Sequence, residues 1–252
     1  MPEVTILLDT TTGAVLVEAP RALPAHLRGL LAERLGPETE VGCARPAAIV
    51  PPPRSPEGAA EEEAFPSLRV AGYYHNSLIE GPGRRSCLLV SGCTLACVGC
   101  WVPVLHAPAG GVRVPVDRLA AALLDPAFER DGVSILGGEP FQQPEGLLGL
   151  VRALRARGCA HILAYSGYTY ERLRRLAVRQ PATGAVLDEI QVLIDGPYVE
   201  ALANEAGPWT GSGNQRVIDL ETTRRRKHVV VLDPHEPSRR VLKGGASPNA
   251  PA

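Results

Sequence analysis

Three cysteines carry the strongest chemical signal in this chain. Cys93, Cys97 and Cys100 stand in the spacing C-x3-C-x2-C. A loop of this spacing brings three thiolates together, which is enough to bind three irons of a [4Fe–4S] cube and leaves the fourth iron without a protein ligand. Structural zinc ions and closed electron-transfer clusters normally take four protein ligands. The spacing therefore indicates an iron–sulfur site that is left open for substrate chemistry.

One alternative is a zinc site in which His106 is the fourth ligand. His75 and His106 flank the cysteine loop, but a lone histidine is more often a hydrogen-bonded loop residue than a ligand, so neither is assigned a role. Cys43, Cys87 and Cys159 are scattered along the chain. We expect them to be reduced residues of a cytoplasmic protein and not ligands of the cluster.

A second motif, Gly137-Gly-Glu-Pro140, follows the apolar run 133–136. Two glycines allow a ligand to approach the backbone closely. Glu139 and its neighbouring backbone groups offer acceptors for an ammonium group. Alone such a pair of glycines is most often an ordinary turn, but downstream of a C-x3-C-x2-C loop it is a stronger indication of a binding site.

The two motifs together resemble the signature of the radical S-adenosylmethionine (SAM) enzymes. The resemblance implies that the amino and carboxylate groups of SAM complete the fourth iron of a [4Fe–4S] cluster. It also implies two sets of residues: cluster ligands and catalytic residues at Cys93, Cys97 and Cys100, and SAM-binding residues at Gly137, Gly138 and Glu139.

Two residues of the cysteine loop bear on the comparison with this family. Gly99 suits the version of the loop found in activating enzymes, and we include it among the SAM-binding residues. After Cys100 the family usually has an aromatic residue or Gln followed by Asn, whereas this chain has Trp101-Val-Pro. Trp101 is expected to shield the adenine of SAM, although a core aromatic residue is an equal alternative.

The segment before the cysteine loop, Ser77-Leu-Ile-Glu-Gly-Pro-Gly-Arg-Arg85, resembles the S-x-x-D-G-P-G-x-R element of glycyl-radical-enzyme activating enzymes, with Glu80 in place of Asp. By this resemblance Arg85 is a catalytic candidate that orients an anionic group of substrate or cofactor. The plainer alternative is a Gly-Pro-Gly turn followed by a surface arginine.

Three later stretches narrow the resemblance. Residues 165–173, 192–198 and 211–219 are similar to the elements T-G-Y-T-x-E-x-L, D-x-L-x-D-G-P-F and G-S-x-N-Q-R of anaerobic ribonucleoside-triphosphate reductase activating proteins. The resemblance then covers roughly residues 74–220. It implies that Ser166 and Asp195 belong to the SAM pocket and that Asn214, Gln215 and Arg216 lie near its rim, although each residue could equally pair locally.

This family implies an activity. A flavodoxin or ferredoxin reduces the cluster, SAM is cleaved to methionine and a 5′-deoxyadenosyl radical, and the radical takes a hydrogen from a glycine of a partner reductase. Arg85, Asn214 and Arg216 are the candidates to meet the glycine-bearing loop or to order the rim. Two alternatives stay open: a radical SAM enzyme that modifies another peptide or a small metabolite, and a metal-binding module without catalysis.

The elements that must position these residues alternate between strand and helix. Apolar runs predict strands at 87–91, 133–136, 161–165 and 190–195, and helical periodicity predicts helices at 116–124, 145–157 and 169–177. Such alternation favours parallel βαβ units. We expect an α/β fold, a partial parallel βα barrel of the radical SAM type, open on one side, with later strands at 215–219 and 228–232. The candidate loops then follow the carboxyl ends of strands.

The predicted domains follow the composition. Residues 1–50 are expected to form a small α+β unit, with a hairpin of 4–9 and 14–18 and a helix over 24–35. We further predict a Pro/Glu-rich linker at 51–70, the radical SAM core at 71–233 and a disordered tail at 234–252.

Overall composition describes a soluble globular protein. The chain has 252 residues, 45% of them hydrophobic, and a net charge of -1. No apolar run reaches the length of about 18 residues that a membrane span needs, and the N-terminus does not resemble a signal peptide. The basic run Arg224 to Lys227 is too short to indicate nucleic acid. We therefore expect a cytoplasmic protein that binds neither nucleic acid nor membrane.

Overall fold

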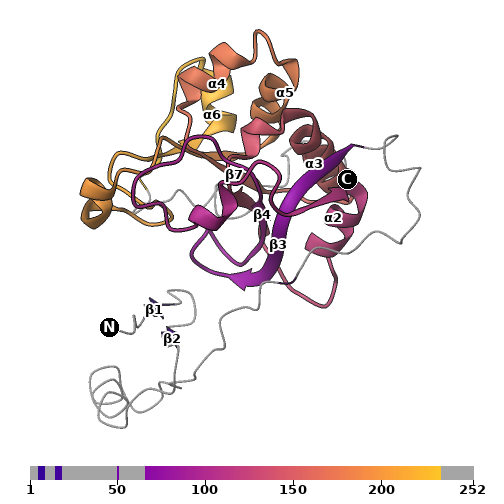
Figure 1. The fold of residues 1–252 in the computed structure, drawn as a ribbon, viewed down its shortest axis with the longest axis horizontal. Helices are drawn as coiled ribbons and strands as arrows, with labels where there is room; N and C mark the ends of the chain where they lie inside the picture. Colours follow the sequence, from indigo (N-terminus) through magenta and orange to yellow (C-terminus); the bar gives the residue numbers. More distant parts are fainter. Residues whose placement is uncertain (1–4, 9–14, 19–49, 51–65, 234–252) are drawn as a thin grey trace, which may run out of the picture. The chain divides into compact units, whose positions relative to one another are not determined.

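The structure is a computed structural model, and it describes residues 5–8, 15–18, 50 and 66–233 (Figure 1). The chain divides into two compact units, Met1–Ala48 and Ile49–Ala252. In the first unit, β1 (Thr5–Leu8) pairs with β2 (Val15–Glu18) as an antiparallel ladder, which is the predicted hairpin. The predicted helix over 24–35, the linker residues 51–65 and the tail from 234 lie outside the described residues.

The second unit is built on one seven-stranded sheet with the order β5-β3-β4-β6-β7-β8-β9. Its central strands β4, β6, β7 and β8 are parallel, whereas β3, β5 and β9 run antiparallel to their neighbours. The sheet is therefore mixed. Its strands are β3 (Ser67–Ser77), β4 (Arg85–Val90), β5 (Val112–Pro115), β6 (Gly132–Gly137), β7 (Ile162–Ser166), β8 (Val192–Asp195) and β9 (Arg216–Asp219).

The four parallel strands confirm the sequence prediction, but the margins of the sheet differ from it. Leu68 and Val70 of β3 are fully buried, so residues 67–70 belong to the sheet and not to a linker. The strand β3 is not evident from the sequence, because Gly72 and a register shift beside it interrupt the alternation of buried and exposed residues. The strand predicted at 228–232 is wrong: within it only Val231 forms an isolated bridge, to Ile218.

The helices predicted at 116–124, 145–157 and 169–177 are confirmed, and two more follow. The second unit contains α2 (Val116–Leu123), α3 (Pro144–Ala156), α4 (Tyr170–Leu176), α5 (Pro181–Glu189) and α6 (Leu220–Arg226). Figure 1 shows α4, α5 and α6 grouped together. No helix in the described ranges has both the length and the apolar character that a membrane crossing requires.

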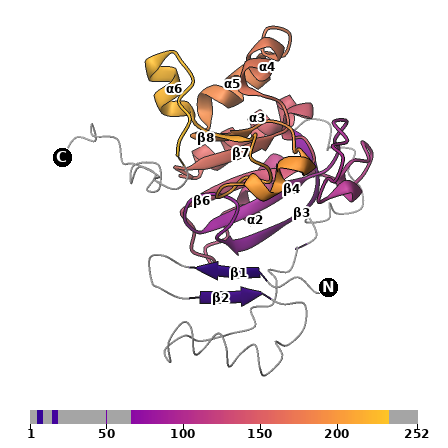
Figure 2. The ribbon, with the colours of Figure 1, turned by 90° about the vertical axis from the view of Figure 1, so that its left-hand side faces the viewer.

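Both faces of the central strands are buried, which explains why these strands are almost wholly apolar. On one face Leu88, Ile135 and Ala164 pack in a single core with apolar residues of the helices. Figure 2 shows α3, α4 and α5 on this same side of β7 and β8. On the other face Leu163 and Ile194 lie in a smaller core that contains no helix residue among those described. Helices thus cover one face of the sheet and loops cover the other.

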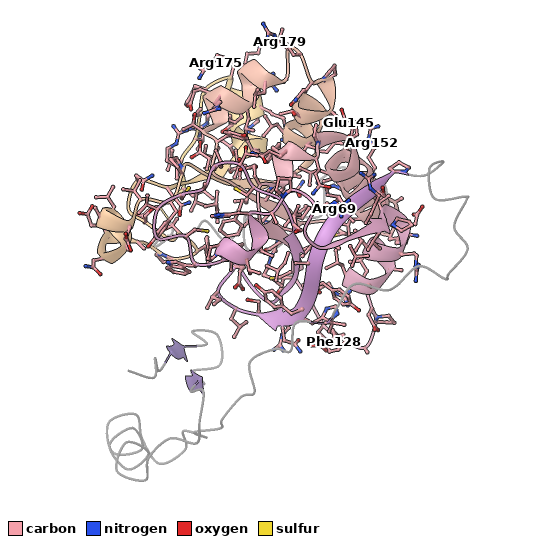
Figure 3. The ribbon with its side chains drawn as sticks, in the orientation of Figure 1. Arg69, Phe128, Glu145, Arg152, Arg175 and Arg179 are labelled. Carbon is pink, nitrogen blue, oxygen red and sulfur yellow. The ribbon has the colours of Figure 1, made fainter. Side chains whose placement is uncertain are left out.

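The basic run at 224–227 has a structural explanation. Arg224, Arg225 and Arg226 form the last turn of α6, and Lys227 ends that helix in the left-handed conformation, with φ of 58°. Positive side chains at the carboxyl end of a helix interact favourably with its dipole. Arg175 of α4 and the nearby Arg179 project outward in a similar way (Figure 3). The run therefore forms the end of a helix.

Candidate functional site

The cysteine loop leaves the carboxyl end of β4. Its backbone is fixed where it starts, since Gly92 N donates to Leu105 O at 2.9 Å and Cys93 N donates to His106 O at 3.2 Å. A turn closes farther along, where Cys100 N donates to Cys97 O at 3.2 Å. All three predicted ligands are free and half-buried. The fold therefore places three thiols on one short loop at the edge where parallel strands place their functional loops.

The donor set fits an iron–sulfur cube better than a single ion. A cube binds one thiolate for each iron, so its cysteines surround the cluster and need not converge on one point. Among the described residues, no three His, Cys, Asp or Glu side chains form a group that could hold a single metal ion. The zinc alternative with His106 therefore gains no support, whereas three half-buried thiols on a folded loop suit a cube.

Two other cysteines lie apart from this loop. Cys87 is fully buried within β4, and burial raises the pKa of its thiol to about 12. Cys159 is 8% exposed, and burial raises the pKa of its thiol as well. Burial raises the pKa of the half-buried Cys93 thiol too, so it is the near-complete burial of Cys87 and Cys159 outside the cysteine loop that disfavours a ligand role. Cys43 lies outside the described residues.

The Gly-Gly-Glu loop at the end of β6 packs directly on the cysteine loop. Gly138 N donates to Val90 O at 2.7 Å, and Glu139 N donates to Gly92 O at 2.9 Å. A Cβ at Gly138 would lie 2.4 Å from Gly92 O, and one at Gly137 would lie 2.6 Å from Val90 O. The missing side chains at both glycines make room for the neighbouring backbone, and contact of this loop with SAM stays a prediction.

Gly138→Ala is expected to separate these two loops, because the new Cβ would meet a backbone carbonyl that cannot rotate away. We expect iron content after anaerobic reconstitution to fall by more than half. Gly158→Ala is the matched control. Gly158 has a φ of +85° and nothing within 4 Å, so alanine there costs about 1–2 kcal/mol of backbone strain without a collision. Equal iron content in the two variants would contradict the prediction.

Glu139 is 1% exposed and forms three hydrogen bonds inside the protein. Its Oε1 accepts from Phe141 N and from Ser166 Oγ, both at 3.0 Å, and its Oε2 accepts from Gly167 N at 2.8 Å. Burial raises the pKa of this carboxyl group to about 7. A carboxylate has about four lone-pair sites, so little capacity remains for a ligand. The carboxylate chiefly joins the loop after β6 to the loop after β7.

Ser166 ends β7 and is almost completely buried. Its hydroxyl donates to Glu139 and accepts from Tyr168 N at 3.0 Å. On the same loop, a Cβ at Gly167 would lie 2.4 Å from the Leu95 side chain of the cysteine loop. The structure therefore brings the predicted residues 137–139 and 166 together beside the cysteine loop.

Asp195 ends β8 and is fully buried. Arg216 donates from Nε to Oδ1 at 2.9 Å and from Nη2 to Oδ2 at 2.5 Å, while Tyr170 N donates to Oδ2 at 2.6 Å. Arg216 also pairs with Glu171 at 2.9 Å. Asp195 is thus bound to the first residue of α4 and to the first residue of β9.

The residues before Arg216 continue this pairing. Gln215 Nε2 donates to Gly196 O at 3.0 Å, and Asn214 Nδ2 donates to Pro197 O at 2.8 Å. Three consecutive residues, 214–216, therefore hold three consecutive residues, 195–197, in antiparallel order. We call this set of contacts the 214–216 clasp. These contacts are local pairing, which the sequence left open as the alternative to a role of Asn214, Gln215 and Arg216 at the rim of the SAM pocket.

The structure overturns the role proposed for Arg85. The side chain is 1% exposed, and burial lowers the pKa of its guanidinium to about 10. Arg85 starts β4, about 17 Å along the strand from the residue that precedes the cysteine loop. It cannot meet a partner at the rim. Its hydrogen-bond partners are Ser134 Oγ, Pro82 O, Val133 O and His161 Nδ1.

Trp101 and Gly99 lie at the outer part of the cysteine loop. Trp101 is 73% exposed, so the alternative of a core aromatic residue is wrong. Its ring lies 6.0 Å from the ring of Tyr198, edge to face. Gly99 has a φ of +71°, and a Cβ there would lie 2.6 Å from Glu200 Cδ. The cysteine loop therefore borders the loop that follows β8.

Sequence reasoning missed several groups that shape this site. Gln142, Gln143 and Tyr168 all hydrogen-bond near the cysteine loop, and Glu171 completes the pairing of Arg216. The position of the two glutamines directly after Gly-Gly-Glu-Pro was an available signal. Tyr168 and Glu171 lie within a stretch already identified by its resemblance.

Comparisons with known proteins agree with this geometry. Residues 79–218 match the family model described as a 4Fe-4S single cluster domain, which covers more than half of the chain. A relative from Salmonella typhimurium named anaerobic ribonucleoside-triphosphate reductase-activating protein is 33% identical over 160 residues, 61% of this chain and 99% of the relative.

Two further matches are more distant. Pyruvate formate-lyase-activating enzyme of Clostridium pasteurianum is 31% identical over 125 residues, 48% of this chain and 51% of that protein. The crystal structure of QueE from Escherichia coli is similar with a TM-score of 0.33 and 17% identity, over 44% of this chain and 58% of that one. The match over 99% of the Salmonella typhimurium relative and the family model are decisive. The chain belongs to the radical SAM family of glycyl-radical activating enzymes, which use a [4Fe–4S] cluster and SAM.

Proposed function

We propose that this enzyme generates a glycyl radical on a partner, and that the partner is an anaerobic ribonucleoside-triphosphate reductase. One observation carries the proposal: the start of the cysteine loop, at Val90 and Gly92, is hydrogen-bonded through its backbone to the Gly-Gly-Glu loop, within the region that matches the family. The near-complete coverage of the reductase-activating relative supports the choice of partner.

The residues divide the work between them. Cys93, Cys97 and Cys100 are the groups that would hold the cluster, and residues 137–139 with Ser166 would border SAM. The bound cofactors supply reductive cleavage of SAM to methionine and a 5′-deoxyadenosyl radical. This chain supplies orientation: Glu139 fixes the loop after β7 against the loop after β6, and the 214–216 clasp fixes the loop after β8.

A macromolecular partner needs a side of the sheet to approach. We propose that the strands β4, β6, β7 and β8 form the parallel part of an incomplete barrel, and that a glycine-bearing segment approaches the face that loops cover. The absence of described helix residues from the core on that face supports this arrangement. We further propose that a flavodoxin or ferredoxin supplies the electron in the cytoplasm and that neither nucleic acid nor membrane takes part.

Anaerobic reconstitution tests the function directly. The loaded protein is reduced with SAM, and 5′-deoxyadenosine is measured with and without the reductase encoded in the same genome. We expect cleavage of SAM and a glycyl doublet in the electron paramagnetic resonance (EPR) spectrum of the reductase. Cleavage without a doublet, together with turnover of a short peptide or metabolite, would move the assignment to another radical SAM substrate. If the fully loaded protein did not cleave SAM, the result would favour the alternative of a metal-binding module without catalysis.

Glu139→Ala is expected to weaken SAM binding by about ten- to a hundredfold while iron content stays intact. The substitution removes a charged acceptor from three donors, each bond being worth roughly 1.5–3 kcal/mol, and frees the loop after β7. Titration of the loaded protein with SAM measures the effect. Glu145→Ala is the matched control, since Glu145 is exposed in the first turn of α3 (Figure 3). SAM affinity equal to that of the control would contradict the prediction.

A further inference from the structure

Gln142 lies at the end of the short 3-10 helix η3 (Pro140–Gln142), directly after the Gly-Gly-Glu loop. Its side chain makes three hydrogen bonds to two other loops. Oε1 accepts from Thr94 N at 3.1 Å, and Nε2 donates to Thr94 Oγ1 at 2.7 Å and to Tyr168 OH at 2.9 Å. One amide therefore holds both the backbone and the side chain of the residue that follows Cys93.

Gln143 acts on the other side of the same cysteine. Its Nε2 donates to Ser91 O and to Arg69 O, both at 3.1 Å, and its Oε1 accepts from Arg69 N at 2.8 Å. Arg69 lies on β3 (Figure 3). Ser91 is buried and stands two residues before Cys93. Gln143 therefore attaches the start of the cysteine loop to β3.

Together the two glutamines, which we call the glutamine pair, hold Cys93 from both sides. The chain enters the loop at Ser91, which Gln143 binds, and leaves the first ligand at Thr94, which Gln142 binds. Tyr168 adds the loop after β7, which also carries Ser166. Gln142 thus links the cysteine loop to the loop after β6 and to the loop after β7, which are the same two loops that Glu139 connects.

An amide suits this position because it accepts and donates at once. Thr94 N requires an acceptor, whereas the two hydroxyl groups can either accept or donate. Leucine offers neither function. Glutamate offers only acceptors, but both hydroxyl groups can rotate to donate to it, so glutamate can keep all three contacts while adding a negative charge beside a cluster ligand.

We propose that Gln142 is a positioning residue that sets the cluster relative to bound SAM, with Gln143 fixing the start of the same loop. The inference rests on the proposed function, because it assumes that the three cysteines and SAM meet at this site. Gln142 acts through Thr94 and Tyr168 and not by contact with the reacting atoms.

The test compares Gln142→Leu, Gln142→Glu and the control Gln180→Leu in the reconstituted full-length protein. Gln180 is exposed and precedes α5, far along the chain from the cysteine loop. Three quantities are measured: iron content, SAM affinity from the change in the EPR spectrum of the reduced cluster, and the reduction potential of the cluster.

We expect Gln142→Leu to retain iron but to bind SAM about tenfold more weakly, because Thr94 N loses its acceptor. Gln142→Glu should keep SAM affinity within about threefold and should lower the reduction potential, because a nearby negative charge opposes the added electron. Gln180→Leu should match the unmodified protein. Normal SAM affinity in Gln142→Leu would overturn the proposal, and so would an equal loss of SAM affinity in Gln142→Leu and Gln142→Glu. An unshifted reduction potential in Gln142→Glu would also overturn it.

Tyr168→Phe provides a test that does not depend on the leucine variant loading its iron. It removes only the hydroxyl group that Gln142 binds, and we expect SAM affinity to fall about threefold at full iron content. Unchanged affinity would overturn the proposal. Failure of the proposed function has a different result, since the unmodified loaded protein would then fail to cleave SAM whatever residue stands at 142.

Discussion

Cys97→Ala is expected to abolish iron binding and, with it, all cleavage of SAM. A cube held by three thiolates has no spare protein ligand, so the loss of one leaves two irons without protein ligands. The described part of the chain offers no substitute, because Cys87 and Cys159 are buried and lie outside the cysteine loop. Iron per chain after anaerobic reconstitution, followed by a 5′-deoxyadenosine assay, measures the effect.

Cys87→Ala and Cys159→Ala are the controls for this prediction. Each removes a buried sulfur and is expected to lower the free energy of unfolding by about 1–2 kcal/mol through lost packing, with iron content unchanged. If Cys87→Ala lost its iron as completely as Cys97→Ala, the assignment of the ligands would be wrong.

Arg216→Met is expected to lower the free energy of unfolding by about 3 kcal/mol, because it leaves the fully buried carboxylate of Asp195 without its positive partner. This value lies at the lower end for a buried pair, since the Arg216 side chain is 32% exposed. Urea unfolding measures it. SAM affinity should fall in the same variant, because the loop that follows β8 loses its strongest attachment.

Two comparisons make the Arg216 prediction specific. Arg174→Met breaks an ion pair of 3.5 Å whose side chains are 47% and 59% exposed, and it should change the free energy of unfolding by no more than about 0.5 kcal/mol. The double variant Asp195→Asn/Arg216→Met should recover most of the loss, because the buried group is then neutral and still accepts from Tyr170 N. An Arg216→Met variant as stable as Arg174→Met would show that the pair contributes little.

The strands and helices that sequence reasoning found share a strong periodic signal. The parallel strands are continuous apolar runs, and α3 has leucines and valine on one face, most of them buried. What it missed lacks that signal. β3 carries polar residues and a register irregularity, and α5 is weakly patterned. The sequence predicts the strand β9 but not its antiparallel pairing with β8. Only tertiary contacts determine these features.

The candidate site was predictable in its residues but less so in their roles. The spacing of Cys93, Cys97 and Cys100 depends on local chain geometry, which a sequence displays directly. The partners of Arg85, Asp195 and Glu139 come from distant segments, so no local pattern shows that all three side chains are occupied by the protein itself. The same holds for the glutamine pair, whose contacts with Ser91 and Thr94 reach across more than forty residues.

The 214–216 clasp has a consequence for how the sequence can vary over evolutionary time. Its contacts join residues 195–197 directly to residues 214–216, so they close off the intervening segment at its base. The 3-10 helix η4 (Glu200–Glu205) within that segment contains no buried residue. Insertions and deletions within η4 are therefore expected to be tolerated, whereas a one-residue insertion or deletion inside the clasp is not. Natural variants of different length in this segment would give one scaffold several surfaces beside the same cysteine loop.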